Sequence, residues 1–158
     1  MSVLLAMALL AGPVSVSEDA SVATVTAHPE ATLYDPARNA GADVDAALAR
    51  ARASGKRVIV AMGANWCHDS KSLAGWFEKL RFKAMLATKY EVVFVDVGKP
   101  QTGNGRNIDI ARRFGIRKIK GTPTVLVLSS EGQLLNKKDA PSWRNAASRS
   151  EDDIYGYF

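Results

Sequence analysis

One cysteine, Cys67, is the residue of this chain best suited to covalent chemistry. It lies in the stretch "GANWCHDSKSL" at 63–73, after an apolar run, "RVIVAM", and at the start of a helical pattern. In the first turn of a helix, unpaired backbone N–H groups and the positive end of the helix dipole favour a thiolate, which is the nucleophilic form of cysteine. The spacing therefore predicts a reactive, accessible thiol, and an inert buried thiol is the alternative.

The residues that follow Cys67 could tune this thiol or simply face solvent. His68 favours the thiolate when it is protonated, whereas the carboxylate of Asp69 opposes it. Ser70 can donate a hydrogen bond to the thiolate from one helical turn away, or it is a plain helix residue. Its hydroxyl cannot replace a second thiol, because it is not a sulfur nucleophile. With a single cysteine, the chain cannot form an internal disulfide.

A metal site is not expected from the sequence. His28 and His68 are the only histidines, and they lie far apart along the chain. One cysteine with two such histidines lacks the ligand spacing of a zinc site. The sequence therefore predicts no metal ligands.

The hydrophobic pattern predicts eight elements in the order helix, strand, helix, strand, helix, strand, strand, helix. Their expected ranges are 41–55, 57–62, 67–80 with a helical continuation at 82–90, 91–97, 108–115, 124–128, 133–135 and 151–158. The apolar face of the second helix is expected to consist of Leu73, Trp76, Phe77 and Leu80. Two crossovers of the βαβ kind, followed by a hairpin and a closing helix, indicate an α/β fold with a mixed sheet covered on both faces.

The motifs resemble the thioredoxin superfamily over roughly residues 44–158. A strand runs into "NWCHDSK" and is followed by "VVFVDV", by "GTPTVLVL" and by a terminal hairpin and helix. The chain is especially similar to bacterial exported thioredoxin-family proteins described as disulfide-isomerase-like. In those proteins "YDP", an Ala-rich helix, "GANWC", "VDVG" and a terminal "IY-x-x-F" occur in this order. The resemblance implies a thioredoxin-like α/β fold with an N-terminal helical extension.

The resemblance also implies which residues form the site. Cys67 would be the nucleophile, and Trp66 would form the surface beside its sulfur. Thr122 and Pro123 would be joined by a cis peptide bond, lie against the cysteine and offer backbone groups to an extended substrate. The basic stretch 117–120, "RKIK", precedes this loop and could favour acidic peptides or a glutathione carboxylate, although a solvated loop is the simpler interpretation.

Two departures from the family pattern determine the expected function. Ser70 stands where the family usually has a second cysteine, which makes the motif Cys-x-x-Ser, and Ala61 stands where the family has a buried acid. The chain is therefore expected to be a single-thiol exchange protein, of the disulfide isomerase or mixed-disulfide reductase type, that acts on protein thiols and disulfides. It needs no cofactor, and glutathione is the candidate co-substrate. The alternatives are a monothiol glutaredoxin-like protein that depends on glutathione, and a catalytically silent binding module.

The N-terminal region predicts export. The apolar run at 3–11 is too short to span a bilayer, and small and polar residues follow it. We expect a signal peptide at 1–23, a polar leader at 24–40 and the thioredoxin-like domain at 41–158. The mature protein would be a periplasmic or otherwise exported monomer without a membrane span, with a cytoplasmic location as the alternative. The net charge of +5 is spread along the chain, so that nucleic acid is not an expected partner.

Overall fold

The computed structural model describes residues 28–158, so the predicted signal peptide at 1–23 lies outside the described residues. The helices are α1 (Ala40–Ser54), α2 (His68–Phe77), α3 (Leu80–Lys89), α4 (Ile108–Arg113) and α5 (Glu151–Tyr157). The strands are β1 (Arg57–Gly63), β2 (Tyr90–Asp96), β3 (Gly98–Lys99), β4 (Asn104–Gly105) and β5 (Thr124–Leu128). Two 3₁₀ segments, η1 (Pro100–Thr102) and η2 (Ala140–Ser148), complete the described elements.

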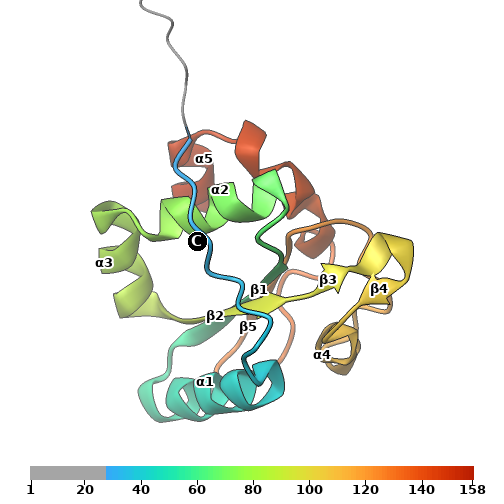
Figure 1. The fold of residues 1–158 in the computed structure, drawn as a ribbon. Helices are drawn as coiled ribbons and strands as arrows, with labels where there is room; N and C mark the ends of the chain where they lie inside the picture. The colour runs from blue at the N-terminus through green and yellow to red at the C-terminus, as the bar shows by residue number, and fades with distance from the viewer. Residues whose placement is uncertain (1–27) are drawn as a thin grey trace, which may run out of the picture.

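The central sheet is mixed and has the strand order β2-β1-β5 (Figure 1). Strand β1 pairs in parallel with β2, so that Val60 lies opposite Val93, and it pairs antiparallel with β5, where Val60 lies opposite Leu126. A parallel pair needs a crossover connection. Helices α2 and α3 form it, and α2 begins after the short loop that follows the carboxyl end of β1.

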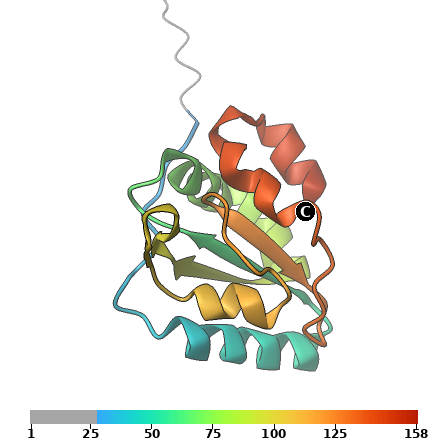
Figure 2. The same ribbon diagram turned by 90° about the vertical axis from the view of Figure 1, so that its right-hand side faces the viewer.

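Alternate residues of the central strand pack against helices on opposite faces of the sheet. Val58, Val60 and Met62 share a core with α1 and α4. Ile59 and Ala61 share the other core with α2, α3, η2 and α5. Figure 2 shows α1 and α4 together on one side of the sheet and the remaining helices on the other. Both faces of the sheet are thus covered, as the sequence predicts.

The predicted second helix divides into two, and this corrects the expected burial of Leu80. Helix α2 ends at Phe77, and Lys79 has an extended backbone with ψ near 144° before α3 begins at Leu80. The new helix axis turns Leu80 outward, where it is 86% exposed. Phe82, Met85 and Leu86 form the buried face of α3 instead.

The predicted strand at 133–135 is reduced to a single bridge between Leu128 and Leu134. The side chain of Asn136 forms hydrogen bonds with backbone groups of β5 that a longer strand would pair. Its Oδ1 accepts a hydrogen bond from the Val127 amide at 2.8 Å, and its Nδ2 donates to the Val125 carbonyl at 2.9 Å. The edge of β5 is therefore satisfied without a full hairpin partner.

The packed domain begins before residue 41, within the segment that the sequence predicts as a polar leader. The Ala31 amide donates to the Lys71 carbonyl at 3.0 Å, and Tyr34 is fully buried in the core that contains α2. Residues 28–39 therefore belong to the folded unit. Among the helices of the described part of the chain, none is long and apolar enough to cross a membrane.

Candidate functional site

Cys67 caps the N-terminus of α2, directly after the loop that leaves β1. Its backbone is extended, with φ −90° and ψ 121°, and its carbonyl accepts the Lys71 amide at 3.0 Å in the first turn of the helix. The thiol donates to the carbonyl oxygen of Thr122 at 3.2 Å. The residue is only 9% exposed. The expectation of a freely accessible thiol is therefore wrong, because the loop before β5 packs over the sulfur.

The loop that covers Cys67 holds the two residues predicted to lie beside it. The Thr122–Pro123 peptide bond is cis. Thr122 and Pro123 are both buried, and the Thr124 hydroxyl donates to the Gly121 carbonyl at 2.9 Å, which holds the loop at the start of β5. The Thr122 carbonyl that accepts the hydrogen bond from the Cys67 thiol belongs to this cis peptide. The structure thus brings together Cys67 and the predicted substrate-binding loop.

Trp66 lies on the surface beside the cysteine. Its side chain is 53% exposed, and its indole N–H donates to the Gly98 carbonyl at 2.9 Å. This bond fixes the ring against the small hairpin formed by β3 and β4. A hollow of about 240 Å³ adjoins it, lined also by Pro36, Asp96, Gly98, Lys99, Asn104 and Arg106. An aromatic surface with nearby cations therefore flanks the site.

Ser70 supports the loop before Cys67 instead of facing the sulfur. It is fully buried, and its Oγ accepts a hydrogen bond from the Ala64 amide at 3.3 Å. Its backbone carbonyl accepts from the Tyr34 hydroxyl at 3.3 Å. Within residues 28–158, no hydrogen bond joins Ser70 to the Cys67 thiol. The predicted role as a hydrogen-bond donor to the thiolate is thus not seen in this structure.

Gly63, the last residue of β1, leaves no room for a side chain behind this loop. An added Cβ would lie 2.5 Å from Ser70 Oγ and 2.7 Å from a ring carbon of Tyr34. We expect Gly63→Ala to lower the free energy of unfolding in urea by about 1–3 kcal/mol, because overpacking displaces both neighbours. Gly156→Ala is the control, since nothing lies within 4 Å of its added Cβ in α5. Equal stability of the two variants would contradict this account.

The two polar residues after Cys67 have specific partners. His68 Nδ1 lies 2.6 Å from Glu30 Oε1, and the His68 side chain is 60% exposed. Asp69 Oδ1 accepts the Ala147 amide at 2.8 Å and so holds η2 against α2. A positive charge on His68 would be offset by Glu30, which weakens its expected effect on the thiolate. Asp69 is a structural contact and not only a solvated residue.

The histidines that are far apart in the sequence are neighbours in space. The ring centroids of His28 and His68 are 4.4 Å apart. Glu30 lies beside them and also pairs with Lys71 at 2.8 Å. The hydrogen bond from Lys71 lowers the pKa of Glu30, and the bond from His68 lowers it further. Separation along the chain is therefore no argument against a metal site at these residues.

Tyr34 is the main residue of the site region that the sequence analysis does not predict. Its amide donates to Asn65 Oδ1 at 3.1 Å, and Asn65 Nδ2 returns a bond to the Tyr34 carbonyl at 2.8 Å. Burial raises the pKa of the Tyr34 hydroxyl, and the nearby Cys67 raises it further. The "YDP" stretch is the only sequence signal for this residue. Through these bonds to Asn65, Tyr34 joins the N-terminal segment to the loop that carries the cysteine.

The basic stretch before the cis-proline loop is mostly solvated. Arg117, Lys118 and Lys120 are exposed, whereas Ile119 is buried in the core with α1 and α4. These cations surround an anchoring apolar residue. The simpler interpretation of a solvated loop fits this arrangement.

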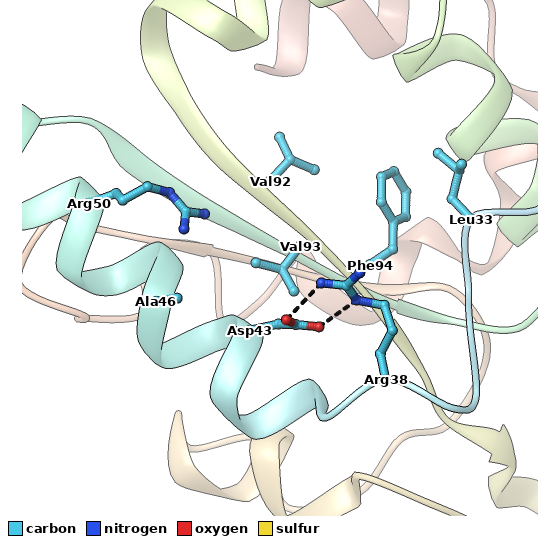
Figure 3. Close-up of a pocket in the computed structure, with 8 residues that line it drawn as sticks. All are labelled: Leu33, Arg38, Asp43, Ala46, Arg50, Val92, Val93 and Phe94. Atoms are coloured by element: carbon cyan, nitrogen blue, oxygen red, sulfur yellow. Dashed lines mark hydrogen bonds and ion pairs between the residues drawn. The ribbon is translucent and has the colours of Figure 1, made fainter.

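A second hollow lies away from the cysteine, between α1 and the edge strand β2 (Figure 3). Its volume is about 290 Å³, and its lining includes Leu33, Arg50 and Phe94. Arg38 and Asp43 also line it and pair at 2.7 Å, and the hydrogen bond from Arg38 lowers the pKa of the Asp43 carboxyl. None of the predicted site residues lines this hollow, so we do not assign it to the thiol chemistry.

The fold and the site define a thioredoxin-like protein. The family described as thioredoxin-like matches residues 39–130, and the chain belongs to this family. Among solved structures, the chain is similar to a disulphide isomerase from Xylella fastidiosa Temecula1, with 29% sequence identity and a TM-score of 0.70. That match covers 80% of this chain and 94% of the isomerase. Comparison with curated proteins gives no match. Family and neighbour together support thiol–disulfide oxidoreductase chemistry at the level of the family.

Proposed function

We propose that the protein is a single-thiol thiol–disulfide exchange protein, of the disulfide isomerase or mixed-disulfide reductase type, that acts through Cys67. The observation that carries the proposal is the position of the sulfur, at the N-terminus of α2 and 3.2 Å from the Thr122 carbonyl. The whole sequence contains no second cysteine. A thiol so placed can attack a disulfide, but no thiol of the same chain can resolve the product.

Loss of the thiol proton would change the contacts of the sulfur. The neutral thiol donates to the Thr122 carbonyl oxygen. A thiolate has no proton to donate and would be repelled by that oxygen. It would be attracted instead by the backbone N–H groups and the positive dipole end at the start of α2. Deprotonation would therefore move the sulfur away from the loop that covers it.

The exchange step forms one disulfide and breaks another. The Cys67 thiolate attacks one sulfur of a substrate disulfide, a bond forms between the two sulfurs, and the other substrate sulfur leaves as a thiolate. Exposed Trp66 offers a surface to the substrate chain, whereas the backbone beside Pro123, which is predicted to pair with the substrate, is buried in this structure.

Release needs a thiol from outside the chain. If a neighbouring thiolate of the substrate attacks the mixed disulfide, the substrate is isomerised without net oxidation or reduction. If glutathione attacks the Cys67 sulfur of the mixed disulfide, the substrate leaves as a thiolate and glutathione becomes the new partner of Cys67. A second glutathione must then attack the glutathione sulfur of this adduct to restore the free Cys67 thiol. We propose protein thiols and disulfides as substrates, glutathione as co-substrate, no further cofactor, and an exported monomer as the working form.

The first test is adduct formation with oxidised glutathione. We expect the folded protein to gain one glutathione per chain, measured by intact mass, and to lose it on addition of a reducing thiol. Cys67→Ser is the control and should gain none. The same incubation in denaturant reports the reactivity of the uncovered thiol. An adduct that forms only in denaturant would show that Cys67 is buried and inert, and would favour the silent binding module.

A further inference from the structure

His28, Glu30 and His68 form a compact group of possible metal ligands. Their nitrogen and oxygen ligand atoms all lie within 4.8 Å of one another. Residues 28–30 come from the N-terminal segment, whereas His68 is the first residue of α2. The chain has no other histidine, so that both of its imidazoles meet at this one place.

One of these residues has a buried polar atom without the hydrogen-bond partner that such an atom normally has. His28 Nδ1 is buried, and it has no hydrogen-bond partner among residues 28–158. Most buried side-chain polar atoms in proteins are hydrogen-bonded, so an unpaired one needs an explanation. A metal ion bound at this nitrogen, which would accept the nitrogen lone pair, would supply that explanation.

The other two ligands are already aligned with each other. His68 Nδ1 and Glu30 Oε1 lie 2.6 Å apart, so that a hydrogen bond joins the two side chains. Glu30 Oε2 faces Lys71 Nζ at 2.8 Å. Lys71 thus orients the carboxylate from outside the ligand group, as residues that hold the ligands in place do in metal sites. A cation could take the place of this hydrogen bond and leave the pair between Glu30 and Lys71 intact.

The donor set favours a divalent transition-metal ion. Two imidazole nitrogens and one carboxylate oxygen are the ligands of zinc sites that keep a fourth position open. Zn–N distances of about 2.0–2.1 Å place tetrahedral ligands roughly 3.3 Å apart, so separations of up to 4.8 Å must shorten by up to about 1.5 Å. The exposed His68 side chain has the freedom to do so.

We propose that His28, Glu30 and His68 bind one divalent transition-metal ion of the zinc class. The bound ion would fasten residues 28–30 to the start of α2. It would also place a positive charge at His68, the residue that follows Cys67 in the chain. The inference goes beyond the proposed exchange function and does not depend on it, because its test measures binding in a chain without the thiol.

The test uses Zn²⁺ as the probe and the full-length chain with Cys67→Ser, which removes the thiol as a ligand. Titration calorimetry should give one Zn²⁺ per chain. Adding His28→Ala, His68→Ala or Glu30→Gln should each weaken binding at least about tenfold. Glu78→Gln is the matched control, because Glu78 is also a carboxylate of the α2 region paired with a lysine, here Lys83 at 2.7 Å. It should bind as the parent does.

Imidazole NMR signals give a second readout that needs no ligand variant. Both histidine rings should shift together and saturate at one equivalent of Zn²⁺. Binding that is unchanged by either histidine substitution, or a shift of one ring alone, would overturn the proposal. Loss of binding in the Glu78→Gln control to the same extent would overturn it as well.

Discussion

Replacing Ser70 by cysteine is expected to raise the rate of insulin reduction, with a small dithiol as electron source, by at least about tenfold over wild type. The wild-type chain has no second thiol, so each mixed disulfide persists until an outside thiol attacks it. A cysteine one helical turn after Cys67 lies within the Cα separation that a disulfide needs. It would attack the mixed disulfide from within the molecule, where its effective concentration is high.

The substitution also changes the contacts of position 70, which is fully buried and whose side chain faces the Ala64 amide in the wild-type chain. The new thiol must rotate toward Cys67 to attack the mixed disulfide. The variant loses the hydrogen bond from the Ala64 amide to Ser70 Oγ and should be about 1 kcal/mol less stable.

Ser72→Cys is the matched control for this experiment. Ser72 is another fully buried serine of α2. Five residues along a helix place its Cα about 8 Å or more from that of Cys67, beyond the span of a disulfide. It should leave the reduction rate unchanged. If wild type already reduces insulin as fast as Ser70→Cys, the single-thiol account is wrong.

Tyr34→Ala is expected to lower the free energy of unfolding by about 3–5 kcal/mol, the range for removing a large buried aromatic side chain. Tyr34 is fully buried, and its ring packs edge-on against Phe94 with centroids 5.3 Å apart. Its loss would leave a cavity where the N-terminal segment meets the cysteine loop. Urea unfolding followed by tryptophan fluorescence measures the change.

Two further variants separate packing from hydrogen bonding at this position. Tyr34→Phe keeps the ring and loses only the bond to the Ser70 carbonyl, so that it should cost about 1 kcal/mol. Leu80→Ala removes a large apolar side chain that is exposed and should change stability by less than about 0.5 kcal/mol. A small effect of Tyr34→Ala would show that residues 28–39 are not part of the cooperative unit.

Local patterns in the sequence predict most of the fold. The apolar runs of β1 and β5, the helical spacing of Val44, Leu48 and Ala51, and the cap at Gly55 all correspond to elements of the structure. Predictions fail where a short element depends on its surroundings. The helix breaks at Lys79, and the side chain of Asn136 binds a backbone group of β5 that a strand partner would otherwise pair. Hydrophobic periodicity predicts neither feature.

The sequence by itself determines the chemistry that is available. It contains one sulfur nucleophile, a serine three residues later and no second thiol, and these are covalent facts that folding does not change. They exclude an internal resolving step in any conformation.

Only the tertiary structure decides which partners those residues meet. The Thr122 carbonyl covers Cys67, Ser70 turns to the Ala64 amide, and His28 comes to lie beside His68. Two of these contacts join segments that are far apart along the chain. Helix and strand periods are local properties of the sequence. Contacts between distant segments depend instead on the arrangement of the sheet and the N-terminal segment in the folded protein. Burial of the sulfur and the grouping of the two imidazoles therefore follow from the fold and not from the motif.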